Sequence, residues 1–229
     1  MNTHSPTMQS PVEDMVRRLL RSPRLPLVAQ RFQTVLQAEQ EKRQHFYDEI
    51  SELHKAEFIN GEIVMHSPVK LRHDHASVNL LFLLGAFVRK HGLGYVGHEK
   101  LLVCLTRNDY EPDVCFFGQA KPQSFTPDQT KFPAPDLAIE ILSDSTEAID
   151  RGVKFEDYAL HGVSEYWIVD PDQEFVEQYV LKGEAYELAV KVKTGSIASA
   201  TISGFDIPVR AIFDPDEQLA TLQKILSEA

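Results

Sequence analysis

Two carboxylates and a lysine hold positions in this sequence from which they could bind a metal ion and assist a hydrolytic reaction. Asp113 leads directly into the apolar run 114–117, and Glu140 stands alone inside the apolar run 137–142. Lys154 follows in a segment with helical spacing. An acidic side chain within a buried strand costs free energy unless a cation meets it, and a divalent metal ion is one such cation.

The chemistry that suits this set is hydrolysis of a phosphodiester bond. A divalent ion neutralises the charge of the transition state and makes hydroxide available near neutral pH. Mg²⁺ prefers oxygen ligands, commonly one or two carboxylates with several waters retained. Asp113 and Glu140 would supply such ligands if their strands pair, and Lys154 would hold or polarise the attacking water. No spacing of Cys and His residues in the chain resembles a zinc site.

These residues also have structural explanations. Proline followed by aspartate is common as a turn at a loop-to-strand junction, and most helical lysines are solvated. The residues by themselves therefore leave a metal site and a structural role both open. If the site forms, two close carboxylates should raise the pKa of at least one of them in the metal-free protein.

Composition and charge point to one domain with an appendage. The 229 residues suffice for a domain of about 150–200 residues plus an extension. The net charge of −11 is uneven, because residues 1–100 carry a net charge of +2 and residues 101–229 carry −13. The acidic bulk opposes tight binding of a monomer to duplex nucleic acid, whereas histidines, lysines and arginines between 66 and 100 offer a local cationic face. This conflict stays open.

The sequence predicts a cytoplasmic protein with no membrane contact. No apolar stretch approaches the ~20 residues of a membrane span, and the polar residues 1–11 contain no apolar signal core. Cys104 and Cys115 both lie in apolar runs, which favours small core residues in a reducing compartment over a disulfide.

Local patterns predict a mixture of helices and strands. Asn60-Gly61 between two short apolar segments is typical of a tight hairpin turn. Apolar residues at helical spacing and Gly-ended segments predict helices, and short apolar runs predict strands. The expected helices are 12–20, 28–53, 73–91 and the segment carrying Lys154 up to His161-Gly162, and the expected strands are 56–59, 62–65, 101–105, 114–117, 137–142, 165–171, 175–181 and 185–192.

This order predicts an α/β sandwich with a mixed sheet, because helices and strands do not alternate regularly. We expect an N-terminal helical extension over residues 1–45, partly disordered at its start, a main domain over 46–213 and a C-terminal helical tail over 214–229. The sequence does not indicate whether the helix from Val28 to Leu53 packs on its own domain or on a partner subunit.

Two blocks of the sequence together form a specific pattern. The first block comprises 58–68, His73, Asn79-Leu80 and Glu111-Pro112-Asp113; the second comprises 135–143, Asp150-Arg151, Lys154, Tyr158, Gly162-Val163 and 165–171. These blocks resemble the Uma-type family of putative restriction endonucleases, which belongs to the PD-(D/E)xK nuclease-like superfamily. The resemblance covers roughly residues 55–213, and the part from 135 to 171 is highly specific.

The resemblance implies a restriction-endonuclease-like core, with a mixed central β-sheet flanked by helices. It also implies that Asp113 and Glu140 are metal ligands, that Lys154 is the catalytic lysine and that Glu57 is an auxiliary acidic residue. The superfamily motif places its lysine two residues after the glutamate, where this chain has Leu142. The lysine function would then have moved to the following helix, at Lys154.

Three further residues complete the expected site. We expect the backbone carbonyl of Ile141 to lie near the shared ion as an additional ligand. His73 matches a family position and, with Tyr158 one turn after Lys154, is a candidate substrate-binding residue, although both also suit surface or packing roles.

The expected function is that of a Mg²⁺-dependent (or Mn²⁺-dependent) endonuclease acting on DNA. Superfamily members commonly act as homodimers, and the predicted helix 28–53 would serve as a dimer arm. Two alternatives remain open: a catalytically weak nuclease-like binding module, which the acidic C-terminal half favours, and a hydrolase of small phosphoesters, which a narrow pocket would favour.

Overall fold

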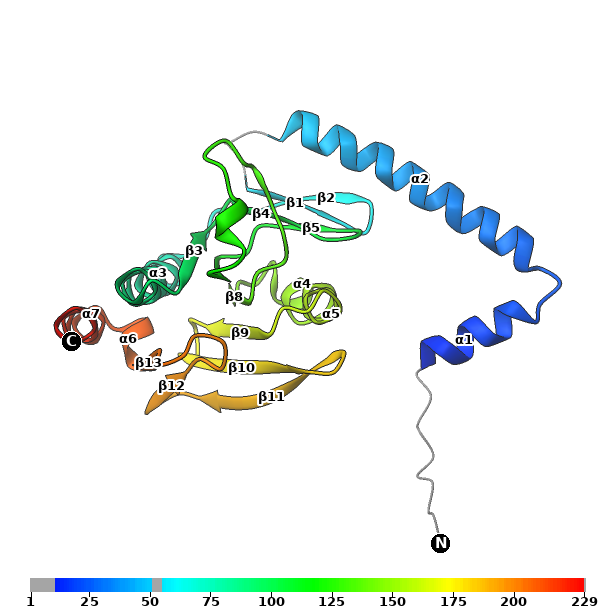
Figure 1. Cartoon of the computed structure of the whole chain (residues 1–229). Helices are drawn as coiled ribbons and strands as arrows, with labels where there is room; N and C mark the ends of the chain where they lie inside the picture. Colours follow the sequence, from blue (N-terminus) through cyan, green and yellow to red (C-terminus); the bar gives the residue numbers. More distant parts are fainter. Residues whose placement is uncertain (1–10, 51–54, 229) are drawn as a thin grey trace, which may run out of the picture. The chain divides into compact units, whose positions relative to one another are not determined.

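The computed structural model describes residues 11–50 and 55–228 (Figure 1). The chain divides into two compact units between Glu49 and Ile50, so the predicted boundary near residue 45 falls inside a helix. The prediction of disorder at the start of the chain falls on residues outside the described part. Within the described ranges, no helix is both long enough and apolar enough to cross a membrane.

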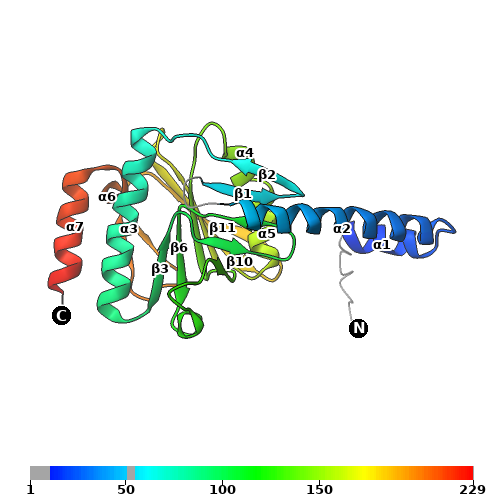
Figure 2. The same cartoon turned by 90° about the horizontal axis from the view of Figure 1, so that it is seen from above.

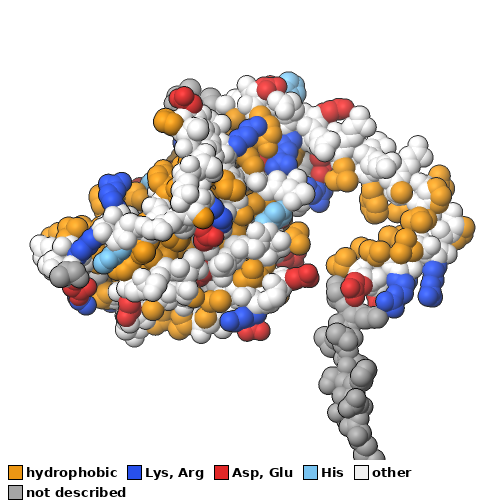
Figure 3. Space-filling model, viewed as in Figure 1, with side chains coloured by type: hydrophobic (Ala, Val, Ile, Leu, Met, Phe, Trp, Pro, Cys, Tyr) orange, Lys and Arg blue, Asp and Glu red, His pale blue; other side chains and the backbone are white. Residues whose placement is uncertain are grey.

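The first unit consists of two helices, α1 (Pro11–Leu20) and α2 (Leu25–Glu49). The predicted helix from Val28 therefore begins three residues earlier, and its predicted end at Leu53 lies outside the described residues. Both helices expose apolar side chains, and Figure 3 shows these gathered on α1 and on the part of α2 next to it. The exposed large apolar residues of this unit are Val12, Met15, Val16, Leu20, Leu27, Phe32, Val35 and Leu36.

The second unit is built on a six-stranded mixed sheet with the strand order β11-β10-β9-β8-β6-β3. The central β8 and β9 run parallel, and the other neighbouring pairs are antiparallel. The strands are β3 (Gly94–His98), β6 (Val114–Gly118), β8 (Leu137–Ile141), β9 (Glu165–Asp170), β10 (Phe175–Lys182) and β11 (Ala185–Val192).

A second, five-stranded sheet has the order β2-β1-β5-β4-β7. Its hairpin confirms the prediction made from Asn60-Gly61, because both residues have positive φ angles (51° and 83°) and the flanking strands pair as expected. The strands are β1 (Ala56–Ile59), β2 (Glu62–Met65), β4 (Leu102–Cys104), β5 (Asp109–Tyr110) and β7 (Lys131–Phe132). The remaining strands, β12 (Ser196–Ala198) and β13 (Asp206–Pro208), form a separate pair.

Helices cover both faces of the six-stranded sheet, with α3 and α7 on one side and α5 on the other (Figure 2). Side chains alternate along β8 accordingly: Leu137, Ile139 and Ile141 join the core beneath α3, whereas Ala138 and Leu142 join the core beneath α5. The helices are α3 (Leu71–His91), α4 (Glu147–Asp150), α5 (Val153–Leu160), α6 (Arg210–Phe213) and α7 (Pro215–Ser227), with the 3₁₀ turn η1 (Pro122–Ser124).

Glycine makes possible the edge pairing of β3 with β6, which the sequence patterns do not predict. Gly94 has a φ angle of +150° and pairs with Gly118 at the end of the ladder. A Cβ atom on Gly94 would overlap the carbonyl oxygen of Phe117. The sequence of β3, Gly-Tyr-Val-Gly-His, lacks the apolar alternation of a half-buried strand, so its place in the sheet depends on this close backbone approach.

We predict that Gly94→Ala lowers the free energy of unfolding by at least about 2 kcal/mol, because the new methyl group strains the β3–β6 ladder. Gly85→Ala is the matched control: Gly85 lies in α3 with no atom within 4 Å of the added Cβ. We expect this control to be neutral or to gain up to about 1 kcal/mol from helix propensity. Urea denaturation of both variants checks the prediction, and equal stabilities would contradict it.

Candidate active site

The chain crosses from the five-stranded sheet to the six-stranded sheet at Glu111-Pro112-Asp113, between β5 and β6. Asp113 therefore stands at the head of β6, beside the carboxyl end of the neighbouring strand β8. The amide of Ile141 on β8 donates a hydrogen bond to Asp113 Oδ2 at 2.8 Å. This bond joins Asp113 to the backbone immediately after Glu140, so both carboxylates face one region between the sheets.

Lys154 is the centre of a buried cluster of carboxylates. Its side chain is 2% exposed, and its Nζ atom lies 3.0 Å from Glu57 Oε1, 3.0 Å from Glu140 Oε1 and 3.2 Å from Asp150 Oδ1. The hydroxyl of Tyr158, one turn further along α5, also donates to Glu140 Oε1 at 3.0 Å. The structure thus brings together residues from β1, β8, α4 and α5, including four of the predicted site residues, Glu57, Glu140, Lys154 and Tyr158.

Asp113 has a cation of its own. Lys55 Nζ donates to Asp113 Oδ1 at 2.6 Å, and His73 Nε2 lies 3.4 Å from Asp113 Oδ2. His73 comes from the first turn of α3 and is buried, and its Nδ1 atom makes no hydrogen bond. The predicted residue His73 is therefore placed as a neighbour of Asp113.

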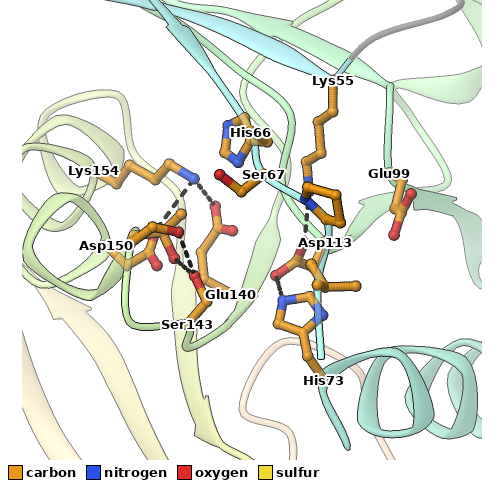
Figure 4. Close-up of a pocket in the computed structure, with 14 residues that line it drawn as sticks. Lys55, His66, Ser67, His73, Glu99, Asp113, Glu140, Ser143, Asp150 and Lys154 are labelled. Carbon is orange, nitrogen blue, oxygen red and sulfur yellow. Dashed lines mark hydrogen bonds and ion pairs between the residues drawn. The ribbon is translucent and has the colours of Figure 1, made fainter. Parts of the chain in front are cut away.

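The two clusters face each other across a pocket of about 430 Å³ (Figure 4). Lys154, Glu140 and Asp150 lie on one side, and Lys55 and Asp113 lie on the other. Hydroxyl groups from the loop after β8 complete part of the wall. The other lining residues are His66, Ser67, Pro68, Val69, His73, Glu99, Ser143, Ser145 and Thr146.

The carboxylates of the pocket differ in their affinity for protons. Burial, reinforced by the charges of Asp150, Asp113 and Glu57, raises the pKa of Glu140 to about 8 although Lys154 opposes the shift. Burial alone would also raise the pKa of Asp113, but Lys55 and His73 outweigh it and lower that pKa. The expectation that at least one of the two carboxylates has a raised pKa is confirmed for Glu140.

The donor atoms fit a hard divalent cation. Glu57, Asp113, Glu140 and Asp150 are four buried carboxylates facing two lysines, which leaves two formal negative charges when all four carboxylates are ionised and the histidines are neutral. Two carboxylate oxygens, Glu57 Oε2 and Asp150 Oδ1, are buried without a hydrogen bond, and their ion-pair contacts with His66 Nε2 and Lys154 Nζ are both 3.2 Å long. Oxygen atoms and a deficit of positive charge are what Mg²⁺ requires.

The site is not a cage made of protein ligands alone. Within residues 11–50 and 55–228, no group of three or more His, Cys, Asp and Glu side chains converges as a metal site. Two carboxylates with waters in the remaining positions is the arrangement that Mg²⁺ commonly adopts. The pocket volume leaves room for such waters.

A second layer of hydrogen bonds holds α5 in position. Asp157 Oδ2 accepts hydrogen bonds from Asn108 Nδ2 at 2.7 Å and from the Tyr110 hydroxyl at 2.8 Å. The Tyr110 ring packs edge-on against Tyr158, with 5.3 Å between ring centroids. The five-stranded sheet thereby fixes the helix that carries Lys154.

Sequence reasoning missed the roles of Lys55, His66 and Asp150. His66 Nε2 lies 3.2 Å from Glu57 Oε2, and Lys55 lies opposite His66 at the open end of the β1–β2 hairpin. The hairpin register was a usable signal, because it places Lys55 and Glu57 on one face of β1. For Ile141, the structure shows its amide bound to Asp113, and the role of its carbonyl as a metal ligand stays a prediction.

The chain is similar to known proteins in sequence and in fold. Residues 41–210 match the family model Uma2, described as a putative restriction endonuclease. An uncharacterized protein of Synechocystis sp. is 28% identical over 133 residues, which cover 57% of this chain and 74% of that protein. The crystal structure of a putative nuclease belonging to DUF820 from Anabaena variabilis has a TM-score of 0.64 and 18% identity, over 77% of this chain and 96% of that one. This likeness confirms the predicted α/β, restriction-endonuclease-like fold class.

A pH-dependent stability follows from Glu111, which is buried next to the site. Its Oε2 atom accepts a hydrogen bond from the Ala56 amide at 3.0 Å, and burial raises its pKa from 4.5 to about 7. The folded protein therefore binds a proton that the unfolded chain has released between about pH 4.5 and 7. Stability contributed by this proton is lost as the pH rises through that range.

We predict that Glu111→Gln, which keeps the acceptor for Ala56, stabilises the protein more at pH 8 than at pH 5. The change in the stability difference should be about 2 kcal/mol, since one pKa unit corresponds to about 1.4 kcal/mol and coupling reduces the full effect. Urea unfolding at both pH values measures it, with exposed Glu184→Gln as the control for a lost carboxylate. If the stability difference between Glu111→Gln and the unmodified protein is the same at both pH values, the pKa of Glu111 is not raised and the prediction is wrong.

Proposed function

The chain belongs to the Uma2 family, whose description is putative restriction endonuclease, and on this basis we propose that it is a Mg²⁺-dependent endonuclease that hydrolyses phosphodiester bonds of DNA. The observation that carries the proposal is the position of Lys154. This lysine comes from α5 and lies 3.0 Å from Glu140, the carboxylate whose sequence neighbourhood lacks the superfamily lysine.

Leu142 explains why the lysine comes from the helix. Leu142 lies two residues after Glu140 and packs in the core with Tyr158, Val163 and Tyr166. A charged side chain at this position would be buried among apolar and aromatic groups, at a high cost in free energy. The following helix α5 covers the same face of β8 and supplies the ammonium group instead.

In the proposed mechanism, Asp113 and Glu140 hold the metal ion, which when bound supplies a Lewis acid for the phosphate and lowers the pKa of a water. Tyr158 fixes the orientation of the Glu140 carboxylate. Glu57 and Asp150 hold the Lys154 ammonium at the pocket wall, where it stabilises negative charge on the reacting phosphate. His73 and Ile141 hold Asp113 in its orientation.

The two alternatives differ from this proposal in what they leave unexplained. A binding module without catalysis gives no reason to keep Lys154 buried among three carboxylates. A small-phosphoester hydrolase suits the pocket volume, but it gives no reason for the match to a family described as endonucleases. Parallel assays on single-stranded, double-stranded and branched DNA and on a chromogenic phosphodiester separate the three.

We also propose that the protein acts as a homodimer through its N-terminal helices. The exposed apolar side chains of α1 and α2 support this, because a helix that buries no apolar face against a neighbour gains little stability in water. Sedimentation equilibrium of the full chain tests the proposal, and a monomer mass at micromolar concentration would overturn it.

We predict that Lys154→Met retains Mn²⁺ binding but lowers the rate of DNA cleavage by about 10²–10³-fold, the usual cost of losing one charge-stabilising donor. Glu140→Ala is the control that loses both metal binding and cleavage. Lys154→Arg keeps a cation and should keep more activity than Lys154→Met, which separates loss of charge from loss of folding.

Thermal unfolding of each variant accompanies the cleavage assay. Unchanged cleavage by a folded Lys154→Met protein would mean that another cation performs this role. Absence of divalent-metal-dependent cleavage by the unmodified protein on every DNA substrate would overturn the proposed function itself.

A further inference from the structure

Lys55 occupies a position on Asp113 that a metal ion would need. Its Nζ atom lies 2.6 Å from Asp113 Oδ1, whereas the other oxygen, Oδ2, is taken by the Ile141 amide and His73. A Mg²⁺ ion binds a carboxylate oxygen at about 2.0–2.1 Å. The ammonium nitrogen is thus only about 0.5 Å farther from Oδ1 than a bound ion would be, and Lys55 lines the same pocket.

The two lysines of the pocket differ in how firmly they are held. Lys154 is 2% exposed and contacts three carboxylates, so moving its ammonium group away would break three ion pairs. The side chain of Lys55 is 18% exposed, and Asp113 is its ion-pair partner. Of these two cations, Lys55 is the one that can leave its carboxylate when another cation arrives.

Glu140 offers an oxygen to the same incoming cation. Its Oε1 atom accepts from Lys154 and Tyr158, while its Oε2 atom takes part in none of the hydrogen bonds or ion pairs that the structure shows among residues 55–228. A metal ion held by Glu140 and Asp113 would therefore meet one competitor, the ammonium on Asp113 Oδ1. Two cations at one carboxylate oxygen repel each other strongly in a partly dry pocket.

We propose that Lys55 is a built-in counter-ion of the metal-free site, which neutralises Asp113 until a divalent ion displaces it. The inference rests on the proposed function, since it takes Asp113 and Glu140 as the metal ligands. Lys55 then sets the metal affinity of the site: it stabilises the metal-free protein and weakens binding of the ion.

The test is calorimetric titration of Mn²⁺ into the full chain at pH 8, comparing the unmodified protein with Lys55→Met. Removing the competitor should tighten Mn²⁺ binding by about tenfold, within the range usual for coupled sites. The melting temperature of metal-free Lys55→Met should fall, because Asp113 loses its cation, and saturating Mn²⁺ should raise it by more than it raises that of the unmodified protein.

Lys121→Met is the matched control. Lys121 pairs with Asp136 at 2.7 Å, a similar ion pair among the partly buried residues, and neither residue lines the pocket. This variant should keep the Mn²⁺ affinity of the unmodified protein. Lys55→Arg retains a competing cation and should also keep that affinity, so it guards against a Lys55→Met protein that fails to fold.

Each outcome is decisive. Tighter binding by Lys55→Met alone supports the counter-ion role. Mn²⁺ binding that is equal or weaker in a folded Lys55→Met protein, or tighter in Lys55→Arg to the same degree, overturns this role and leaves the proposed function standing. If the unmodified protein binds no Mn²⁺, or if its Mn²⁺ binding persists in Glu140→Ala, the proposed metal site is wrong and the inference fails with it.

Discussion

A single buried ammonium group balances three carboxylates in this fold, and the arrangement of the second unit depends on that balance. Lys154 contacts Glu57 from one sheet, Glu140 from the other and Asp150 from the preceding helix. Burial and the neighbouring carboxylates raise the pKa of Glu140 to about 8 although Lys154 opposes this shift. Burial would also raise the pKa of Glu57, but Lys154 and His66 outweigh it and lower that pKa to about 2. A buried lysine with too many acidic partners leaves the pocket short of positive charge, and a divalent cation would supply it.

The two sheets and the helices that cover them hold these charged side chains in position. The six-stranded sheet is covered by α3 on one face and by α5 on the other, so the alternating side chains of β8 are buried in both directions. Glu140 is the polar member of this alternation, and it faces α5 with Leu142. The five-stranded sheet presents Glu57 to Lys154 and, through Tyr110 and Asn108, fixes α5. The geometry of the pocket and the stability of the second unit therefore depend on the same contacts.

Much of this could be predicted from the sequence, because the signals are local. The Asn60-Gly61 turn, the apolar strand around Glu140 and the end of α5 just before His161-Gly162 all follow from turn chemistry and periodicity. Glu140 and Leu142 share one face of the strand because side chains alternate with a period of two residues. A short turn after the strand then brings the helix with Lys154 back over this face. The pairing of Lys55 with Asp113 could not be predicted in this way, since Asp113 is 58 residues away and the pairing of β1 with β5 that joins them is non-local. The edge strand β3 was not predicted because its two glycines leave no alternation of apolar and polar side chains to identify a strand.

The central claim is that Asp113 and Glu140 hold one divalent ion in the pocket. The most direct measurement is the anomalous scattering of Mn²⁺ in crystals of the protein grown with MnCl₂. The account predicts one strong peak within about 2.0–2.4 Å of a carboxylate oxygen of each residue, with water in the other coordination positions. A Mn²⁺ peak that contacts neither carboxylate, or a pocket that stays free of Mn²⁺ at saturating concentration, would contradict it.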